Sequence, residues 1–193
     1  GAGIDIRTIG YLGLIALPYA AKPLWAPLID RFSLPFSGRR RGWLFATQVG
    51  LALALWWLSA CDPTRGLTGF VVAAIIVAVV SATHDIVVDA YRADILSDEE
   101  AGAGVAGYVL GFRLAMVLAG WLPLALSVDA PWPVVYQVMT VFLAVGMLGT
   151  LLAPEPAEPA DPPRGFYAVV VLPFVAFGER RGMRGTVAVL AFV

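Results

Sequence analysis

The strongest constraint on this chain is a series of long stretches with few or no charged residues. A helix needs about 20 apolar residues to cross the hydrocarbon of a bilayer. Five stretches meet this requirement, and a sixth apolar run opens near residue 186 and continues to Val193. The predicted spans are 8–29, 42–60, 66–89, 103–126 and 133–153. Because the connections are short, we expect an all-α, up-and-down bundle in a membrane.

Composition supports this environment and excludes others. The chain is 60% hydrophobic and only 14% charged, whereas a soluble domain has about a quarter of its residues charged. A net charge of -1, without a basic helix or zinc-finger spacing, argues against nucleic-acid binding. The single cysteine, Cys61, and the single histidine, His84, exclude an internal disulfide and a histidine-rich metal site. We therefore expect the lipid bilayer as a partner, and neither a metal nor a cofactor.

The distribution of Lys and Arg predicts the orientation, because short loops rich in these residues stay in the cytoplasm. Loops 30–41, 90–102 and 154–185 carry nine arginines, whereas the other side holds only Arg7 and Arg65. The nine are Arg31, Arg39, Arg40, Arg41, Arg92, Arg164, Arg180, Arg181 and Arg184. This places the three loops inside and Gly1 outside. An outside start without a signal peptide, and an end inside an apolar run, indicate further spans on both sides.

Tryptophans fit the same orientation. Trp56 and Trp57 close the outer end of the second span, and Trp132 opens the outer end of the fifth. Together they are typical of an interfacial aromatic belt, although any one of them could simply fill space.

Residues 154–164 read PEPAEPADPPR, whose five prolines prevent regular helix or sheet. This segment is predicted to be an extended linker. The apolar run 166–177 is interrupted by Pro173 and is too short to span, so it is expected to lie at the interface. The whole region 154–185 is therefore predicted as a cytoplasmic connection between two halves of a larger carrier, and 186–193 as the start of the next span.

Lys22 lies about eight residues from the inner end of the first span, close to Pro18, Pro23 and Pro27. Prolines free backbone carbonyl groups and bend a helix, which suits a helix that lines a cavity. Lys22 is accordingly predicted to pair with another helix or to serve transport. The alternative is that its long side chain extends to the cytoplasmic headgroups.

Asp85, Asp89 and Arg92 follow a long apolar stretch at helical spacing and share one stripe. Arg113 falls near the middle of the next span, where an isolated guanidinium would be costly. We therefore predict an ion pair between Arg113 and Asp85 or Asp89. The pair could brace two helices or take part in transport, and Asp89 could also be an ordinary interfacial acid.

His84 titrates near neutral pH and could carry a proton, although a lone histidine near a helix end is more often a packing residue. The fourth span presents small residues at four-residue spacing, a pattern that lets another helix approach closely. These helix-packing residues are Gly107, Gly111, Ala115 and Ala119.

The first cytoplasmic turn reads Asp30-Arg31, then 32–37, then Gly38-Arg39-Arg40-Arg41. It resembles the signature G-x-x-x-D-R-x-G-R-R of the major facilitator superfamily, with Ala26 at the leading glycine and a longer gap before the arginines. Alternatively, the basic run simply anchors this loop on the inner side of the membrane. The resemblance implies that these residues form a cytoplasmic gating turn.

Four longer segments resemble the AmpG-type muropeptide permeases, a branch of that superfamily. They are LPYAAKPLWAPLIDRF (17–32), GRRRGW (38–43), SATHDIVVDAYR (81–92) and GYVLGFRLAM (107–116). The match implies helices two to six and the start of seven of a carrier with twelve or more. His84 departs from the branch, which usually has Gln there.

The resemblance implies proton-driven import of anhydro-muropeptides, with an N-acetylglucosamine and anhydro-N-acetylmuramic acid core, through the bacterial inner membrane for peptidoglycan recycling. The carrier would be a monomer and not an enzyme, and Gly1 would be periplasmic. Its two halves would rock about a central site. Asp30 would latch the inner ends by pairing with a basic group such as Arg92, and Lys22, Asp85, Asp89 and Arg113 would form buried charge pairs.

Other functions remain open from the sequence. Acetyl-coenzyme A transporters share part of the signature, so the solute could differ. A non-transporting scaffold would not need charges deep in several spans, and a membrane enzyme would need a converging acid, base or metal set that the spacing does not offer.

Overall fold

The computed structural model describes residue 13 and residues 16–32, 34, 38–62, 67–97 and 99–157, without the side chains of Asp30, Arg31 and Ala101. This part of the chain is helical and contains no strand. Its helices are α2 (Leu17–Arg31), α3 (Arg39–Ala60), α4 (Leu67–Ile95), α5 (Ala101–Leu126) and α6 (Trp132–Leu152). The all-α prediction is confirmed.

Four of the described helices, α3 to α6, are long and apolar enough to cross a membrane. They match the second to fifth predicted spans. The first span is described only from its second half, as α2, and the linker beyond 157 and the run from 186 lie outside the described residues.

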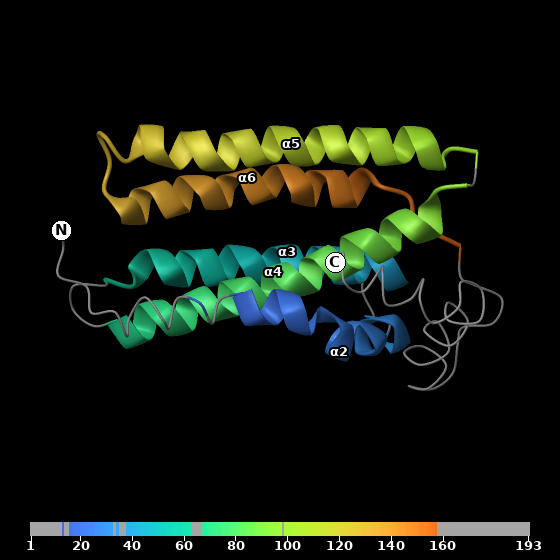
Figure 1. The fold of residues 1–193 in the computed structure, drawn as a ribbon, viewed down its shortest axis with the longest axis horizontal. Coiled ribbons are helices and arrows are strands. Elements are labelled where there is room, and N and C mark those ends of the chain that lie inside the picture. The colour runs from blue at the N-terminus through green and yellow to red at the C-terminus, as the bar shows by residue number, and fades with distance from the viewer. Residues whose placement is uncertain are drawn as a thin grey trace, which may run out of the picture.

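The helices run side by side in a layered bundle (Figure 1). Helix α5 forms one side, α6 lies beneath it, α3 and α4 follow, and α2 closes the opposite side. Helix α3 is central, because it packs extensively against both α4 and α6. Helix α2 packs on α4, and α5 has its main contact with α6.

Two helix ends differ from the expected spans. Helix α3 begins at Arg39 rather than residue 42, and α4 continues to Ile95 rather than ending at residue 89. The predicted polar turns 30–41 and 90–102 are correspondingly shorter. Hydropathy marks where a chain leaves hydrocarbon, whereas a helix continues until its backbone groups find other partners.

Small side chains allow the central helices to approach closely. On α4, Ala73, Ala78 and Ala82 are buried. A Cβ built on Gly50 of α3 would lie 3.2 Å from the Val80 Cγ1 of α4. The α3–α4 interface therefore leaves no room for a larger residue at position 50 without movement of Val80.

A hydrophobic cluster joins α2 to α3 and α4 near the end that holds the arginines. Its buried members are Ile29, Leu44 and Val87, one from each helix. On the other flank of α3, the Gln48 amide donates to the Thr150 hydroxyl of α6 at 2.9 Å, and both residues are buried. These contacts set the positions of α2 and α6 about the central pair.

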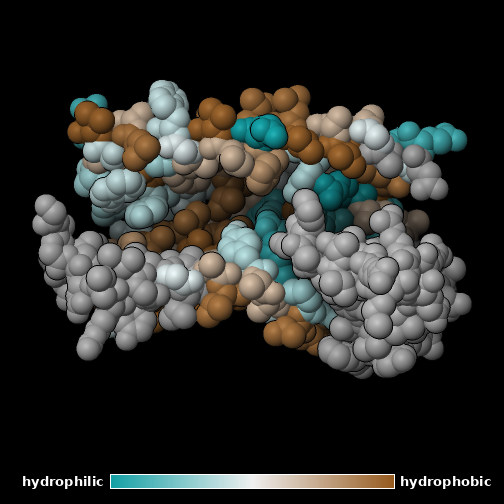
Figure 2. Space-filling view, in the orientation of Figure 1, coloured by the Kyte–Doolittle hydropathy of each residue, from teal (hydrophilic) through white to brown (hydrophobic). Residues whose placement is uncertain are grey.

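Hydrophobic residues are common along the upper edge of the view in Figure 2, where α5 lies. No described residue of α5 is buried, and large apolar side chains along that helix are exposed. Hydrophilic residues gather instead in the hollow beneath α5 and toward the right of the view. This distribution suits contact with lipid or with further apolar helices.

Candidate functional site

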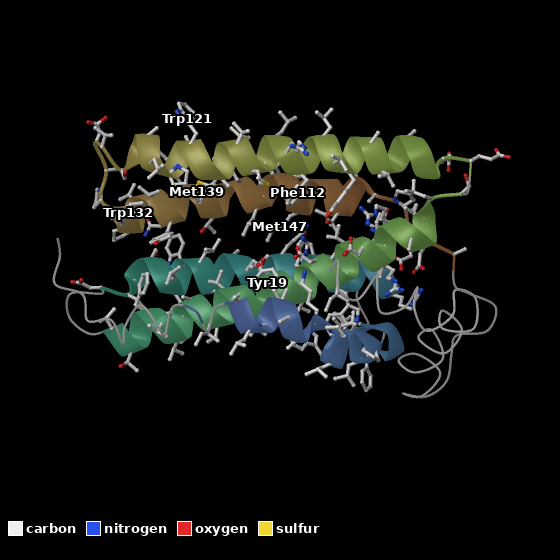
Figure 3. All side chains as sticks on the ribbon, viewed as in Figure 1. Tyr19, Phe112, Trp121, Trp132, Met139 and Met147 are labelled. Atoms are coloured by element: carbon white, nitrogen blue, oxygen red, sulfur yellow. The ribbon has the colours of Figure 1, made fainter. Side chains whose placement is uncertain are left out.

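A ladder of four polar residues joins α2 to α4. The Lys22 Nζ lies 2.7 Å from the Asp85 Oδ2, and the Tyr19 hydroxyl donates to the Ser81 Oγ at 2.8 Å. The Lys22 ammonium also lies 4.9 Å from the centre of the Tyr19 ring. We call Tyr19, Lys22, Ser81 and Asp85 the polar ladder; Figure 3 labels Tyr19 at the middle of the bundle.

Helical spacing produces this ladder. Ser81 and Asp85 are four residues apart on α4, and Tyr19 and Lys22 are three apart on α2, so each helix presents two groups on one face. Side chains of Lys22 and Asp85 are 27% and 47% exposed within the described chain. The ion pair is therefore fixed by its neighbours on one side and open on the other, where a solute could reach it.

His84 faces α3 rather than the ladder. Its Nδ1 lies 2.8 Å from the Thr47 Oγ1, and the same hydroxyl lies 2.8 Å from the Trp43 carbonyl oxygen. A helical threonine commonly donates its single proton to such a carbonyl. The neutral His84 ring then donates through Nδ1, so this contact needs no charged imidazole.

Replacing His84 with glutamine is expected to leave solute uptake by the complete protein within about twofold of the unchanged protein, because the amide N–H can still donate to Thr47. A leucine at the same position should lower the free energy of unfolding by about 1 kcal/mol, because that hydrogen bond is lost. Both variants are tested by measuring uptake in cells and, in parallel, the thermal unfolding of the protein in detergent. A glutamine variant that unfolds normally but has lost uptake would show that the imidazole itself is required.

Asp89 and Arg92 form a separate pair within α4. The Arg92 Nη2 lies 3.1 Å from the Asp89 Oδ1, and the guanidinium carbon lies 4.2 Å from the centre of the Tyr108 ring on α5. The expected latch between Asp30 and Arg92 stays a prediction, because the Asp30 side chain lies outside the description.

The ion pairs differ from the expected contact between Arg113 and Asp85 or Asp89. Asp85 binds Lys22 and Asp89 binds Arg92, and among the described residues Arg113 takes part in no ion pair. The reason is the packing order: α2 lies against α4, while α5 has its main contact with α6. The short turn between α4 and α5 therefore does not make these two helices main partners.

The small-residue face of α5 is open. A Cβ built on Gly107 or Gly111 would meet nothing within 4 Å, and Ala115 and Ala119 are exposed. The predicted packing role of this face stays a prediction, since none of the described helices covers it.

The arginines at the start of α3 meet an acid on α4. The Asp94 Oδ2 lies 2.9 Å from the Arg39 Nη2 and 2.6 Å from the Arg40 Nε. Arg40 is only 6% exposed. We call Arg39, Arg40 and Arg41 the arginine cluster, and Asp94 neutralises two of its members.

A second acid, Glu155, binds the backbone of the same cluster. Its Oε1 accepts from the Arg40 N–H at 2.7 Å, and its Oε2 accepts from the Arg41 N–H at 3.0 Å. These N–H groups belong to the first turn of α3, which has no acid of its own and begins after Gly38. Glu155 therefore caps α3 from the segment after α6, where the positive end of the helix dipole favours a carboxylate.

Gly38 permits this approach. Its φ of 91° lies in the left-handed region, and a Cβ at this position would collide with the Glu155 carboxyl group. Gly38 is thus required for two reasons: the backbone has a positive φ there, and the Glu155 carboxyl group occupies the space that a Cβ would need.

Two more contacts hold the same ends together. The Arg41 Nη2 donates to the Leu151 carbonyl at 2.8 Å, and the Tyr91 hydroxyl donates to the Pro154 carbonyl at 2.8 Å. The ends of α3, α4 and α6 are thereby joined around the arginine cluster. Neither Asp94 nor Glu155 was among the residues predicted from the sequence.

Comparison with known proteins gives a consistent picture. The family described as the Major Facilitator Superfamily matches residues 3–193. The Anhydromuropeptide permease of Escherichia coli (strain K12) is 42% identical over 178 residues, which cover 92% of this chain and 36% of that protein. The putative transporter AmpG 3 of Rickettsia typhi is 35% identical over 153 residues, 77% of this chain and 36% of that protein.

An uncharacterized protein of Haemophilus influenzae is 37% identical over 192 residues, 98% of this chain and 45% of that protein. The chain therefore spans less than half the length of these relatives. The resemblance to AmpG-type permeases predicted from the motifs is confirmed. Together with four apolar helices long enough to span a bilayer, it identifies a multi-pass membrane protein.

Proposed function

This chain belongs to the major facilitator superfamily, and from that premise we propose that it is part of a secondary transporter that imports anhydro-muropeptides across the bacterial inner membrane. The similarity to an Anhydromuropeptide permease supports this choice of solute. The imported molecules would be N-acetylglucosamine–anhydro-N-acetylmuramic acid peptides, and their import would serve peptidoglycan recycling.

The observation that carries the proposal is the polar ladder. A muropeptide presents hydroxyl, amide and carboxylate groups, and the ladder offers two hydroxyls, an ammonium and a carboxylate on adjoining helices. Charged side chains inside a span are costly and are usually kept where they line a solute or ion pathway. In this role Lys22 would bind a substrate carboxylate, and Asp85 would hold the ammonium in place until the substrate arrives.

The same pair offers a route to proton coupling. Protonation of Asp85 would remove the negative charge that holds Lys22, and would free the ammonium for a substrate carboxylate. Proton uptake and substrate binding would then favour the same state of the ladder. His84 is not needed in this scheme, because its contact with Thr47 is satisfied by the neutral ring.

The arginine cluster would act as the inner latch of the rocking motion. Asp94 and Glu155 hold the ends of α3, α4 and the segment after α6 in one arrangement. Opening on this side would separate some of these charge-assisted contacts, and closing would restore them. Asp30 and Arg31, the first two residues of the predicted turn, would belong to the same latch.

We place loops 30–41, 90–102 and 154–185 in the cytoplasm and Gly1 in the periplasm, because nine of the eleven arginines outside the spans then lie inside. The complete carrier would act as a monomer with a proton as its coupling ion.

Uptake by the complete protein tests this proposal. Cells that lack their own muropeptide permease should accumulate radiolabelled GlcNAc-anhydroMurNAc tripeptide when they express the protein, and an uncoupler should abolish the accumulation. Cells with an empty vector give the background. Absence of uptake from cells with normal membrane levels of the protein would overturn the proposed substrate, and uptake of acetyl-coenzyme A instead would assign another one.

A further inference from the structure

Three buried polar side chains lie between the polar ladder and the arginine cluster. Thr47, Gln48 and Thr150 are each at most 7% exposed. Thr47 and Gln48 are consecutive residues of α3, which lies between α4 and α6 (Figure 1). A hydrogen bond between helices in a membrane contributes little to stability on average, so apolar side chains could hold these helices together equally well. The polar contacts therefore indicate a role besides adhesion.

The first contact begins beside the ladder. Asp85 binds Lys22 of α2, and His84, the preceding residue of α4, lies 2.8 Å from the Thr47 hydroxyl of α3. The ion pair to α2 and the hydrogen bond to α3 therefore leave the same turn of α4. A displacement of this turn, as the ion pair opens, would act on α3 through the Thr47 hydroxyl.

The second contact joins α3 to α6 and has two possible arrangements. The Thr150 hydroxyl accepts from the Gln48 amide at 2.9 Å. It also has two acceptors at 3.1 Å, the Gln48 Oε1 and the Gly146 carbonyl oxygen, but only one proton to donate. The proton therefore goes either across to α3 or back into α6. Coupling between two sites requires an element with discrete arrangements of this kind.

The backbone of Thr150 reaches the arginine cluster. Its carbonyl oxygen accepts from the Arg41 Nε at 3.1 Å. Glu155, in the segment that follows α6, caps the first turn of α3. Thr150 thus contacts the middle of α3 through its hydroxyl and the start of α3 through its carbonyl group.

We propose that Thr47, Gln48 and Thr150 are positioning residues that couple the polar ladder to the arginine cluster, and we call them the buried relay. The proposal rests on the proposed function, because it makes the opening of the inner latch depend on the ladder. When the ladder opens, α4 shifts against Thr47, the Thr150 hydroxyl changes its acceptor, and the end of α6 releases the Glu155 cap.

Helix α4 offers a second connection between the same two places. Asp85 and Asp94 lie on this one helix, and Asp94 binds Arg39 and Arg40. This connection does not pass through α6. Substitutions at Thr150 therefore separate the buried relay from direct coupling along α4.

Hydrogen exchange in the complete protein tests the coupling without any solute. Asp85→Asn removes the negative charge of the ladder, and we expect the backbone N–H groups in the first turn of α3 to exchange at least about threefold faster, because the Glu155 cap opens more often. In a Thr150→Val background, the same substitution should change their exchange less than about 1.5-fold. Thr150→Ser keeps the hydroxyl and should retain the full effect.

Thr140→Val is the matched control. Thr140 is also a partly buried threonine of α6, and its hydroxyl donates at 2.8 Å to a carbonyl oxygen of its own helix. The effect of Asp85→Asn should be unchanged in that background. Gln48→Leu combined with Thr150→Val leaves no unpaired amide between α3 and α6, so it should abolish the effect even where Thr150→Val alone folds poorly. Lys22→Met combined with Asp85→Leu replaces Asp85→Asn in the same way.

Uptake gives a second readout. Thr150→Val should lower the maximal rate of muropeptide uptake per folded protein about tenfold, within the range of about 5–150-fold that is typical of coupling between sites. The KM should stay within about twofold, because the buried relay does not touch the solute. Thr150→Ser and Thr140→Val should keep both quantities close to those of the unchanged protein.

The outcomes separate this inference from the proposed function. Equal responses to Asp85→Asn with and without Thr150→Val would eliminate the buried relay and leave coupling along α4 through Asp94. A first turn of α3 that does not respond to Asp85→Asn at all would also overturn the inference. Either result leaves the transport proposal standing if the unchanged protein imports the muropeptide. Absence of uptake, with an exchange response that needs the Thr150 hydroxyl, would count against the transport proposal alone.

Discussion

Uptake is expected to fall to background when Asp85 is replaced by alanine, and the bundle is expected to lose stability at the same time. The substitution leaves the Lys22 ammonium, now 2.7 Å from the Asp85 carboxylate, without its counter-charge. An uncompensated lysine inside a span costs about 2.5–3.5 kcal/mol, and the partial exposure of the pair makes the lower figure the better expectation. Thermal unfolding in detergent and substrate uptake measure the two effects.

A double variant separates a structural brace from a transport role. Lys22→Met combined with Asp85→Leu removes both charges and should restore most of the lost stability, because no unpaired charge remains. Uptake should stay at background if the ladder binds the substrate or the proton. Asp129→Ala is the control, since this exposed acid in the turn after α5 is outside the ladder. Recovery of uptake in the double variant would show that the Lys22–Asp85 pair only holds the two helices together.

Replacement of Glu155 by alanine should have the second largest effect. Two backbone N–H groups in the first turn of α3 lose a charged acceptor at 2.7 and 3.0 Å. Loss of a helix cap costs about 0.5–2 kcal/mol, and hydrogen bonds to a charged group are at the upper end of the usual range. We expect a loss of about 2 kcal/mol in unfolding free energy, together with reduced uptake, because the start of α3 and the segment after α6 are held together less firmly.

Glu155→Gln is the matched control for charge. The amide oxygen can still accept one hydrogen bond, so the loss of stability should be about half of that in the alanine variant. Equal stability of all three proteins in thermal unfolding would mean that the cap contributes nothing, and the latch role would then lose its basis.

The sequence predicted the helices well, because span length and hydropathy are local properties. Four described helices correspond to predicted spans, and Lys22 and Asp85 were both identified as functional charges. Their pairing with each other was not predicted. It depends on α2 packing beside α4, and a short turn between α4 and α5 favoured the wrong neighbour.

Asp94 and Glu155 were missed for a different reason. Asp94 was assigned to a polar turn and Glu155 to a proline-rich linker, where acids are ordinary. A signal was nevertheless present: α3 begins after a glycine, has three arginines at its start and has no acid in its first turn. Such a helix start lacks a local cap, so its acceptor must come from elsewhere in the chain.

The Glu155 cap also bears on biosynthesis. The carboxylate lies 115 residues after the Arg40 N–H that it binds. At a synthesis rate of about 5–20 residues per second, the start of α3 would wait on the order of ten seconds for this partner. Three helices are made during that interval. The end of the bundle that holds the arginine cluster would therefore close late, when α6 has left the ribosome. A nascent chain halted before Glu155 would present an uncapped α3 to the quality-control proteases.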